Sequence, residues 1–252
     1  MLEICSIASG SNGNCYYIGN STDAVLVDVG ISTKQILIRM NERDLDPGKI
    51  KAIFITHEHS DHLRGARVLA KRLQIPVYMT AKTFNNSYKN LRPHYPNFFH
   101  PGDIIEVGEF RIHSVLKNHD AAEPCSFRVE YYGKNVGVFT DIGEACANVQ
   151  THFNLCDGVF LEANYDDKML WDGHYPWYLK KRVASDLGHL SNEQAFDLLN
   201  AHASEDLKCV FLSHISKENN TPEKALDSMQ ALAKKYDIKI ASRYDASEVC
   251  QL

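Results

Sequence analysis

The sequence lacks the features that mark several specialised classes of protein. It has no C-x-x-C pair, and its seven cysteines are an odd and scattered set, which argues against a disulfide framework or a cysteine zinc knuckle. No segment approaches the roughly 18 apolar residues of a membrane span, and Met1 to Ser6 contain no basic leader region. No linker or internal repeat divides the chain. We therefore expect one domain over residues 1–252 with reduced thiols, in the cytoplasm, with no membrane association and no readable obligate protein partner.

The chain also lacks an excess of positive charge. Its 27 lysines and arginines face 32 aspartates and glutamates, which gives a formal net charge of -5. There is thus no global basic field, and any polyanion would have to be held locally. Hydrophobic residues make up 44% of the 252 residues, enough for a sizeable core.

Strand-like and helix-like patterns alternate along the chain. In the first third, apolar runs at 24–29 and 50–55 alternate with helical patterns at 33–43 and 63–74. The middle is richer in strands, at 104–107, 110–116, 127–132 and 135–140. Helices then return: Ser191 and Gln194 form a capping-box pattern, and Thr221-Pro222 opens a further helix. The pattern predicts an α+β fold with two sheets between helical layers.

The most informative segment is an H-x-H-x-D-H motif directly after the strand at 50–55. Two histidines two residues apart on extended backbone project to the same side, so His57 and His59 can bind one cation. Where the chain turns into a helix, Asp61 and His62 point elsewhere and can bind a second cation. Three histidines and an aspartate within six residues make a plain surface loop a poor interpretation.

Further ligand types follow other predicted strands. His119 follows the strand that ends near Leu116, Asp141 follows the run that ends at Thr140, and His214 follows the run that ends at Ser213. A carboxylate can give one oxygen to each of two metals, so we expect Asp141 to bridge, His119 to complete the first site and His214 the second. Histidine and aspartate without cysteine suit Zn, Mn or Fe.

These motifs together resemble the metallo-β-lactamase superfamily across essentially the whole chain. The resemblance implies a four-layer αββα sandwich with a dimetal site at one edge of the sheets. It also implies that Asp28, in the run Val27 to Gly30, contacts the histidine loop and orients it without binding a metal itself. A turn-capping role for Asp28 remains an equal alternative.

Four further stretches, at 7–14, 118–124, 162–166 and 188–195, resemble the YycJ/WalJ family, although Tyr165 departs from its pattern. That family is associated with 5′-to-3′ exonuclease action on DNA, with mismatch repair and with manganese. The resemblance implies a phosphodiester hydrolase with DNA as substrate and two divalent ions, Mn or Zn with Fe also suitable, that share a bridging hydroxide. Asp61 would orient the hydroxide or take its proton. His189, in a Gly-His-Leu-Ser element also found in RNase Z-like nucleases, would donate to a phosphoryl or leaving oxygen, or else form a helix-entry hydrogen bond.

Several substrate contacts stay open. The Gly-Ser-Asn loop with Ser11 and Asn12 is either an anion cradle or a simple turn, and Ser191 has the same two interpretations. Basic residues form either a local track for a polyanion or ordinary solvated helix faces: Arg64, Arg67, Lys71, Arg72, Lys180, Lys181 and Arg182. The aromatic stretch from Tyr165 to Tyr178 either stacks bases or packs as core or lid.

Two other functions compete with the nuclease. The same metal core could hydrolyse a small thioester or lactone, as in glyoxalase II-like enzymes, which have no use for a phosphate donor such as His189. A metal-stabilised binding module without turnover is the third hypothesis, and the complete ligand set disfavours it.

Overall fold

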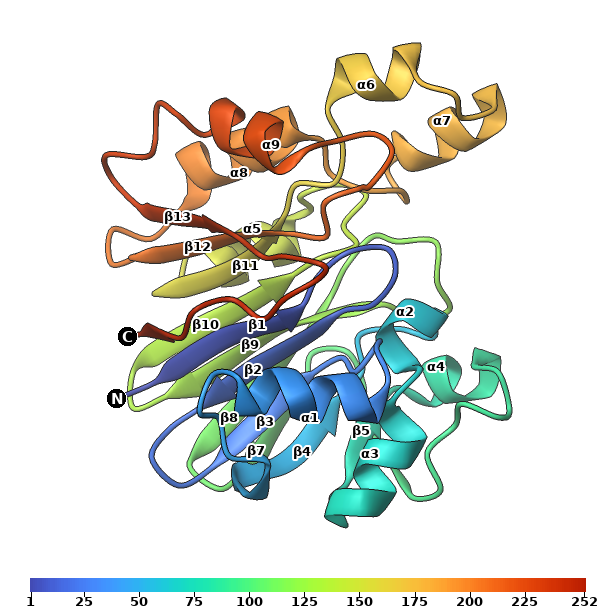
Figure 1. Ribbon diagram of the computed structural model, residues 1–252, viewed down its shortest axis with the longest axis vertical. Coiled ribbons are helices and arrows are strands. Elements are labelled where there is room, and N and C mark those ends of the chain that lie inside the picture. The colour runs from blue at the N-terminus through green and yellow to red at the C-terminus, as the bar shows by residue number, and fades with distance from the viewer.

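Two seven-stranded sheets pack face to face, and helices cover both outer faces (Figure 1). The computed structural model describes all 252 residues. In the first sheet the strand order is β14-β1-β2-β3-β4-β5-β6, and in the second it is β13-β12-β11-β10-β9-β8-β7. The predicted α+β sandwich of four layers is confirmed.

The strands of the first sheet are β1 (Glu3–Ala8), β2 (Cys15–Gly19), β3 (Ala24–Val27), β4 (Ile50–Phe54), β5 (Val77–Met79), β6 (Pro96–Phe98) and β14 (Cys250–Gln251). The strands of the second sheet are β7 (Ile104–Val107), β8 (Phe110–Leu116), β9 (Cys125–Tyr131), β10 (Lys134–Phe139), β11 (Gly158–Glu162), β12 (Cys209–Ser213) and β13 (Asp237–Ile240). The helices are α1 (Thr33–Asn41), α2 (Ser60–Leu63), α3 (Ala66–Leu73), α4 (Ala81–Asn86), α5 (Ala147–Phe153), α6 (Asp167–Asp172), α7 (Trp177–Val183), α8 (Asn192–His202) and α9 (Pro222–Ser228), with one 3-10 turn at Pro47–Lys49. No helix is both long and apolar enough to cross a bilayer.

Three apolar layers fill the spaces between the four structural layers. Strand β3 shows how one strand serves two of them: Ala24 and Leu26 pack toward α1 and α3, whereas Val25 and Val27 pack between the sheets. Successive side chains of a strand point to opposite faces, so a strand covered on both faces is apolar throughout. The third layer lies between the second sheet and the helices α5, α8 and α9.

Each sheet is antiparallel in one half and parallel in the other. Strands β3 to β6 run parallel to one another in the first sheet, and β10 to β13 do so in the second. Parallel strands end at the same edge of a sheet, where open α/β sheets commonly bind ligands. One edge of the sandwich therefore collects the polar residues that lie at or just after the ends of five strands, namely β3, β4, β10, β11 and β12.

The predicted elements agree with the structure except at some boundaries. Strands β7 and β8 occupy the predicted residues, and the capping box of Ser191 and Gln194 is present. The helix predicted at 63–74 begins earlier, at Ser60, and is interrupted at Gly65. There the backbone N–H of Gly65 donates to the carbonyl of Val29 at 2.7 Å, and a side chain would collide with the Ile31 carbonyl. This close approach ties the helical segment to the end of β3.

Candidate metal centre

Three of the strand-end residues at the shared edge have left-handed backbone conformations. Asp28 follows β3 with φ 58°, Asp141 follows β10 with φ 53°, and His214 follows β12 with φ 55°. Such conformations cost roughly 1–3 kcal/mol for non-glycine residues and collect at functional sites. They are held by their surroundings, because the N–H of Asp28 donates to the carbonyl of Phe54 at 2.8 Å and that of His214 to the Ser9 hydroxyl at 2.8 Å.

His57, His59 and His119 form a first cluster of candidate ligands. Their ring nitrogens lie within 4.8 Å of one another, and Nε2 of His57 is 3.0 Å from Nδ1 of His59. Burial, with the neighbouring charge of His62, lowers the pKa of His57 well below its usual range. The ring is therefore neutral at physiological pH, which is the form that binds a metal.

Asp61, His62 and His214 form a second cluster, also with ligand atoms within 4.8 Å. Oδ2 of Asp61 lies 3.5 Å from Nε2 of His62 and 3.7 Å from Nε2 of His214. Burial alone would raise the pKa of Asp61, but the charge of His62 and the neighbouring His214 ring outweigh burial and lower it. The carboxyl group is therefore ionised at neutral pH.

Asp141 lies between the two clusters. Its carboxylate oxygens are 3.2 Å from Nε2 of His62, 3.4 Å from Nδ1 of His214 and 3.9 Å from Nε2 of His119. The structure thus brings together all seven predicted ligands, although they come from segments up to 157 residues apart in the sequence.

The chemistry of this edge fits divalent cations. Nε2 of His119, Nε2 of His214 and Oδ2 of Asp141 are buried and have no hydrogen-bond partner. Buried polar atoms are normally paired, because an unpaired one loses the free energy of its hydration. Imidazole and carboxylate ligands suit Zn, Mn and similar ions, so a bound cation would satisfy all three atoms.

Hydrogen bonds around the clusters fix which ring nitrogen is free. Nδ1 of His62 donates to Oδ2 of Asp28 at 2.7 Å, and the Thr56 hydroxyl donates to the same oxygen at 2.8 Å. That hydroxyl accepts in turn from Nδ1 of His57 at 2.9 Å. Nδ1 of His119 donates to the carbonyl of Gly188 at 3.0 Å. In a neutral ring each contact leaves Nε2 with the lone pair that can bind a metal, and at His62 this atom also lies 3.1 Å from Nδ2 of Asn14. Asp28 therefore contacts the histidine loop rather than serving only as a turn cap.

Glu162, which sequence reasoning missed as a site residue, ends β11 and is fully buried. Its Oε1 accepts from Nδ1 of His189 at 2.8 Å and from Nδ1 of His214 at 2.9 Å. Its Oε2 accepts from the N–H of Ile142 at 2.7 Å and of Leu190 at 3.2 Å. Burial would raise the pKa of Glu162, but the charge and hydrogen bond of His189, and the hydrogen bond of His214, outweigh burial and lower it to about 2. The available signal was its position at the end of an apolar run, the same signal that identified Asp141.

A cavity of about 190 Å³ opens beside the clusters. His189 lines it, with the His189 ring centroid 5.3 Å from that of His119 and 5.2 Å from that of His214. Ser11 also lines it. Asn12 is outside the lining, and its Oδ1 accepts from Arg243.

Of the two interpretations of Ser191, the structure favours the local structural role over the substrate contact. Ser191 is only 3% exposed and does not line the cavity. Its hydroxyl accepts from the N–H of Gln194 at 3.1 Å, and its own N–H donates to the Gln194 side chain. The residue caps α8 and offers no free group to a substrate.

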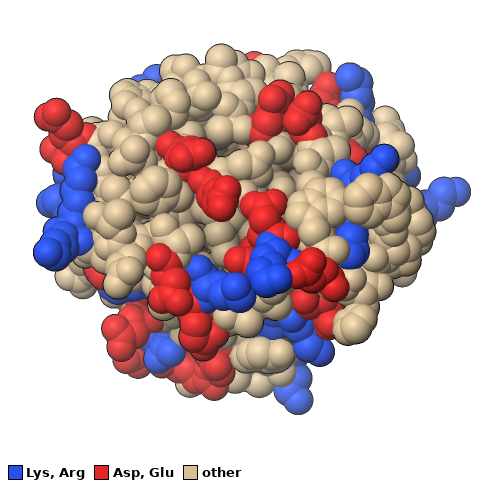
Figure 2. All heavy atoms as spheres, turned by 90° about the horizontal axis from the view of Figure 1, so that it is seen from above, with Lys and Arg blue, Asp and Glu red and all other residues tan.

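The basic residues near α7 do not form a continuous track. Lys180 is buried and donates to the carbonyl of Trp171, and Arg182 pairs with Asp120 at 2.5 Å. Figure 2 shows the face above α6 to α9, where acidic and basic groups lie side by side without a dominant sign. Arg182 lines the cavity, so its charge is local to the candidate metal centre.

The aromatic stretch divides between burial and exposure. Tyr165 is 3% exposed, whereas Trp177 is 62% and Tyr178 is 74% exposed on α7. Tyr175 lines the cavity. The stretch therefore combines a core residue, a cavity wall and an exposed pair.

Comparison with known proteins agrees with this geometry. A profile of the Metallo-beta-lactamase superfamily matches residues 8–214, so the chain belongs to that superfamily. It is a metallo-hydrolase, and the family together with the His/Asp clusters indicates use of a divalent metal.

Relatives of high coverage confirm the resemblance to the YycJ/WalJ family. The chain is 31% identical to the exodeoxyribonuclease YycJ of Bacillus anthracis over 97% of this chain and 94% of that protein. It is 37% identical to the exodeoxyribonuclease WalJ of Streptococcus pneumoniae over 87% of this chain and 83% of that protein. The metallo-beta-lactamase fold protein YhfI of Bacillus subtilis superposes with a TM-score of 0.73 at 16% identity, covering 98% of this chain and 100% of that chain. That structural likeness supports the fold alone.

Proposed function

We propose that this chain is a dinuclear-metal-dependent phosphodiesterase that acts as a 5′-to-3′ DNA exonuclease. Two relatives that cover most of its length are named exodeoxyribonucleases. The observation that carries the proposal is the position of His189, which borders the cavity beside Asp141 and is held by Glu162. A histidine so placed serves phosphoryl chemistry, for which a thioesterase has no need.

The residues that would hold the first ion are His57, His59 and His119, and those that would hold the second are Asp61, His62 and His214, with Asp141 contributing to both. When bound, such ions lower the pKa of a coordinated water and neutralise charge on a phosphate oxygen. Mn or Zn fits these ligands, and Fe is compatible with them.

The side chains of this chain supply the remaining steps. Because Nδ1 of His189 donates to Glu162, Nε2 is the atom that can give a proton to a phosphoryl or leaving oxygen. The Glu162 carboxylate fixes the orientation of the His189 ring through the same hydrogen bond. Asp61, ionised and partly accessible at the cavity, would orient the attacking water or accept its proton. Ser11 would contact the substrate from the cavity wall.

We also infer that residues 1–252 act as one hydrolase domain. Residues from both sheets contribute to the candidate centre: the first supplies the His57 to His62 segment and the second supplies Asp141, Glu162 and His214. Neither sheet carries a complete ligand set alone.

The test compares the parent protein with His189→Ala on end-labelled single-stranded DNA. Each preparation is loaded separately with Mn, Zn or Fe, and its metal content is measured. We expect the parent to release the 5′ label as a mononucleotide at once and to shorten 3′-labelled DNA progressively. His189→Ala should keep its metal and lose about 10²- to 10⁴-fold in rate. His174→Ala, which removes an exposed histidine outside the cavity, is the matched control.

Three results would count against the proposal. Unchanged cleavage by His189→Ala would remove the phosphoryl role. Rapid hydrolysis of a small thioester without DNA shortening would favour the glyoxalase II-like alternative. Tight DNA binding without shortening under any of the three metals would favour a binding module.

A further inference from the structure

Between the metal motif and the middle of the chain lies a segment without any acidic residue. The 41 residues from His62 to Gly102 contain no aspartate or glutamate. They contain seven basic residues: Arg64, Arg67, Lys71, Arg72, Lys82, Lys89 and Arg92. The rest of the chain has 20 basic and 32 acidic residues, a formal charge of -12. The net charge of -5 therefore conceals one strongly basic segment.

Most of these charges have no carboxylate partner. Lys82 alone forms an ion pair, with Glu123 at 2.8 Å. Arg92 donates to the backbone carbonyls of Ser87 and Asn85, and Arg64 donates to the carbonyl of Asn12 at 3.3 Å. The side chains of Arg67 and Lys71 take part in no ion pair and no hydrogen bond, so both are available to an anion.

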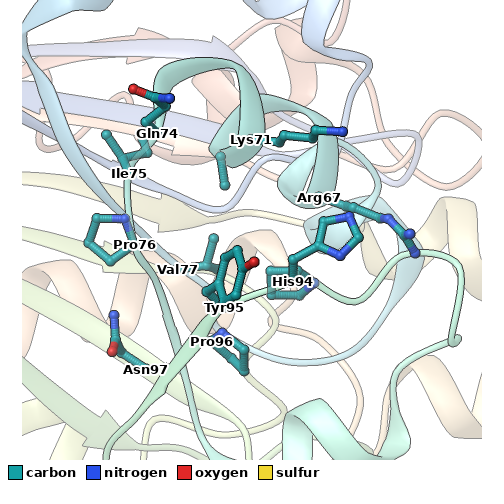
Figure 3. Close-up of a pocket in the computed structure, with 12 residues that line it drawn as sticks. Arg67, Lys71, Gln74, Ile75, Pro76, Val77, His94, Tyr95, Pro96 and Asn97 are labelled. Atoms are coloured by element: carbon teal, nitrogen blue, oxygen red, sulfur yellow. The ribbon is translucent and has the colours of Figure 1, made fainter.

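Arg67 and Lys71 line a cavity of about 650 Å³ between α3 and the segment that enters β6. None of its twelve lining residues is acidic. Figure 3 shows Tyr95 in the middle of the lining, with Arg67 and His94 on one side and Gln74 on the other. Tyr95 is 88% exposed, and its ring centroid is 6.4 Å from that of His94. Exposed rings beside unpaired cations are the combination with which proteins bind single-stranded nucleic acid.

The helical path from the candidate metal centre leads to this cavity. Asp61 and His62 belong to α2, which ends at Leu63, and α3 follows after Arg64 and Gly65 (Figure 1). The backbone path from His62 to Lys71 covers nine residues and bends at Gly65, and at the rise of an α-helix its length is about 14 Å. Phosphates along one stacked strand advance about 3.4 Å each, so this path corresponds to about four nucleotides.

We propose that this cavity is a second contact site for single-stranded DNA, about four nucleotides from the bond that is cleaved. Arg67 and Lys71 pair with backbone phosphates, and Tyr95 stacks on a base with His94 beside it. The site holds the strand while its end occupies the metal centre. This inference rests on the proposed function, because it takes the substrate to be a DNA strand.

The test measures binding to the metal-loaded proteins by fluorescence anisotropy, with dye-labelled oligothymidylates of 4 and 12 nucleotides whose phosphorothioate linkages resist cleavage. The variants are the double change Arg67→Ala with Lys71→Ala, and Tyr95→Ala. The matched controls are Arg72→Ala, on the same helix outside the cavity lining, and Lys89→Ala. Hydrolysis of bis(p-nitrophenyl) phosphate by the metal-loaded proteins serves as a small-substrate control.

We expect the double variant to bind the 12-mer at least ten-fold more weakly and to lower the slope of log K against log salt by about 1.4, since each lost phosphate contact contributes about 0.7 for a single strand. Tyr95→Ala should weaken binding about five-fold without changing the slope. Binding of the 4-mer and hydrolysis of the small ester should be unchanged in both variants, and the controls should match the parent.

Equal 12-mer binding by the parent and the double variant overturns the second site. Equal weakening by Arg72→Ala also overturns it, because the effect would then be a general one of charge. If the parent binds neither oligonucleotide, the second site and the DNA substrate fail together. If the parent binds and cleaves DNA but the variants are indistinguishable from it, the second site fails and the proposed function stands.

Discussion

Nδ1 of His62 donates to Oδ2 of Asp28 across 2.7 Å, and neither side chain is accessible to solvent. The contact holds the ring with Nε2 toward Asp61 and Asp141. We expect Asp28→Asn to weaken binding of one of the two ions by 10- to 100-fold, because outer partners of a ligand histidine set its orientation and basicity. Calorimetric titration of the metal-free protein with Zn or Mn measures the dissociation constants of both ions.

Asp44→Asn is the control for that experiment, because Asp44 also has a left-handed backbone, with φ 54°, but lies exposed on the surface. It should bind both ions as the parent does. Equal weakening of both ions by Asp28→Asn would show that the contact supports the whole edge of the sandwich rather than His62.

Glu162 and His189 should behave as one unit in catalysis. Glu162→Gln removes the charge that holds Nδ1 of His189, so we expect the turnover rate on DNA to fall about 10- to 100-fold at saturating metal. Combining it with His189→Ala should cost little beyond the single histidine change, because residues that act as a unit are not additive. If the loss of turnover rate in the double variant equals the product of the two single losses, Glu162 acts independently of His189, through its contact with His214.

The sequence was sufficient for the fold class and for the composition of the candidate centre because both depend on strand ends. Asp141 and His214 each follow an apolar run, and such runs become parallel strands that end at the same edge. Local patterning also predicted the capping box of α8, which depends on residues three positions apart.

Features that depend on long-range contacts were not predictable in the same way. The burial of Ser191 and the break at Gly65 arise from neighbours distant in sequence. Glu162 acquires its position from two histidines 27 and 52 residues away, which no local spacing reveals. The cavity beside Tyr95 requires α3 and the approach to β6 to meet in space, although the basic residues of α3 were already visible in the sequence.

Removal of metal should lower thermal stability. Three buried atoms, on His119, Asp141 and His214, lack partners without a cation. At a free metal concentration 100-fold above its dissociation constant, one site adds about 2.7 kcal/mol to the free energy of unfolding. For a chain of this length we therefore expect the melting temperature to rise by roughly 5–10 °C over the chelated protein.

Asp141→Asn tests that expectation by differential scanning fluorimetry, since Asp141 lies between both clusters. The metal-dependent rise should fall by at least half in this variant, whereas Asp44→Asn should retain it. A rise of the same size in Asp141→Asn would mean that the ions bind elsewhere.

His152 on α5 should make stability depend on pH independently of the metal centre. Burial, with the charges of Arg128 and His113, lowers its pKa to about 4, and Nδ1 accepts from Nε of Arg128 at 3.2 Å. Glu130 faces His113 rather than His152.

The unfolded chain has the ordinary histidine pKa near 6.5, so between pH 6.5 and about 4 the unfolded state binds a proton that the folded state does not. The contribution of His152 to the free energy of unfolding is therefore full above pH 6.5 and falls as the pH is lowered. Because the ring is partly exposed to solvent, we expect this contribution to be reduced to about 1 kcal/mol at pH 5. Urea denaturation of the chelated protein measures the free energy of unfolding at pH 7.5 and at pH 5. Between these two values the decrease should be about 1 kcal/mol smaller for His152→Gln than for the parent, whereas His174→Gln should show the same decrease as the parent. Parallel pH curves for His152→Gln and the parent would mean that the ring is protonated in the folded protein with its ordinary pKa.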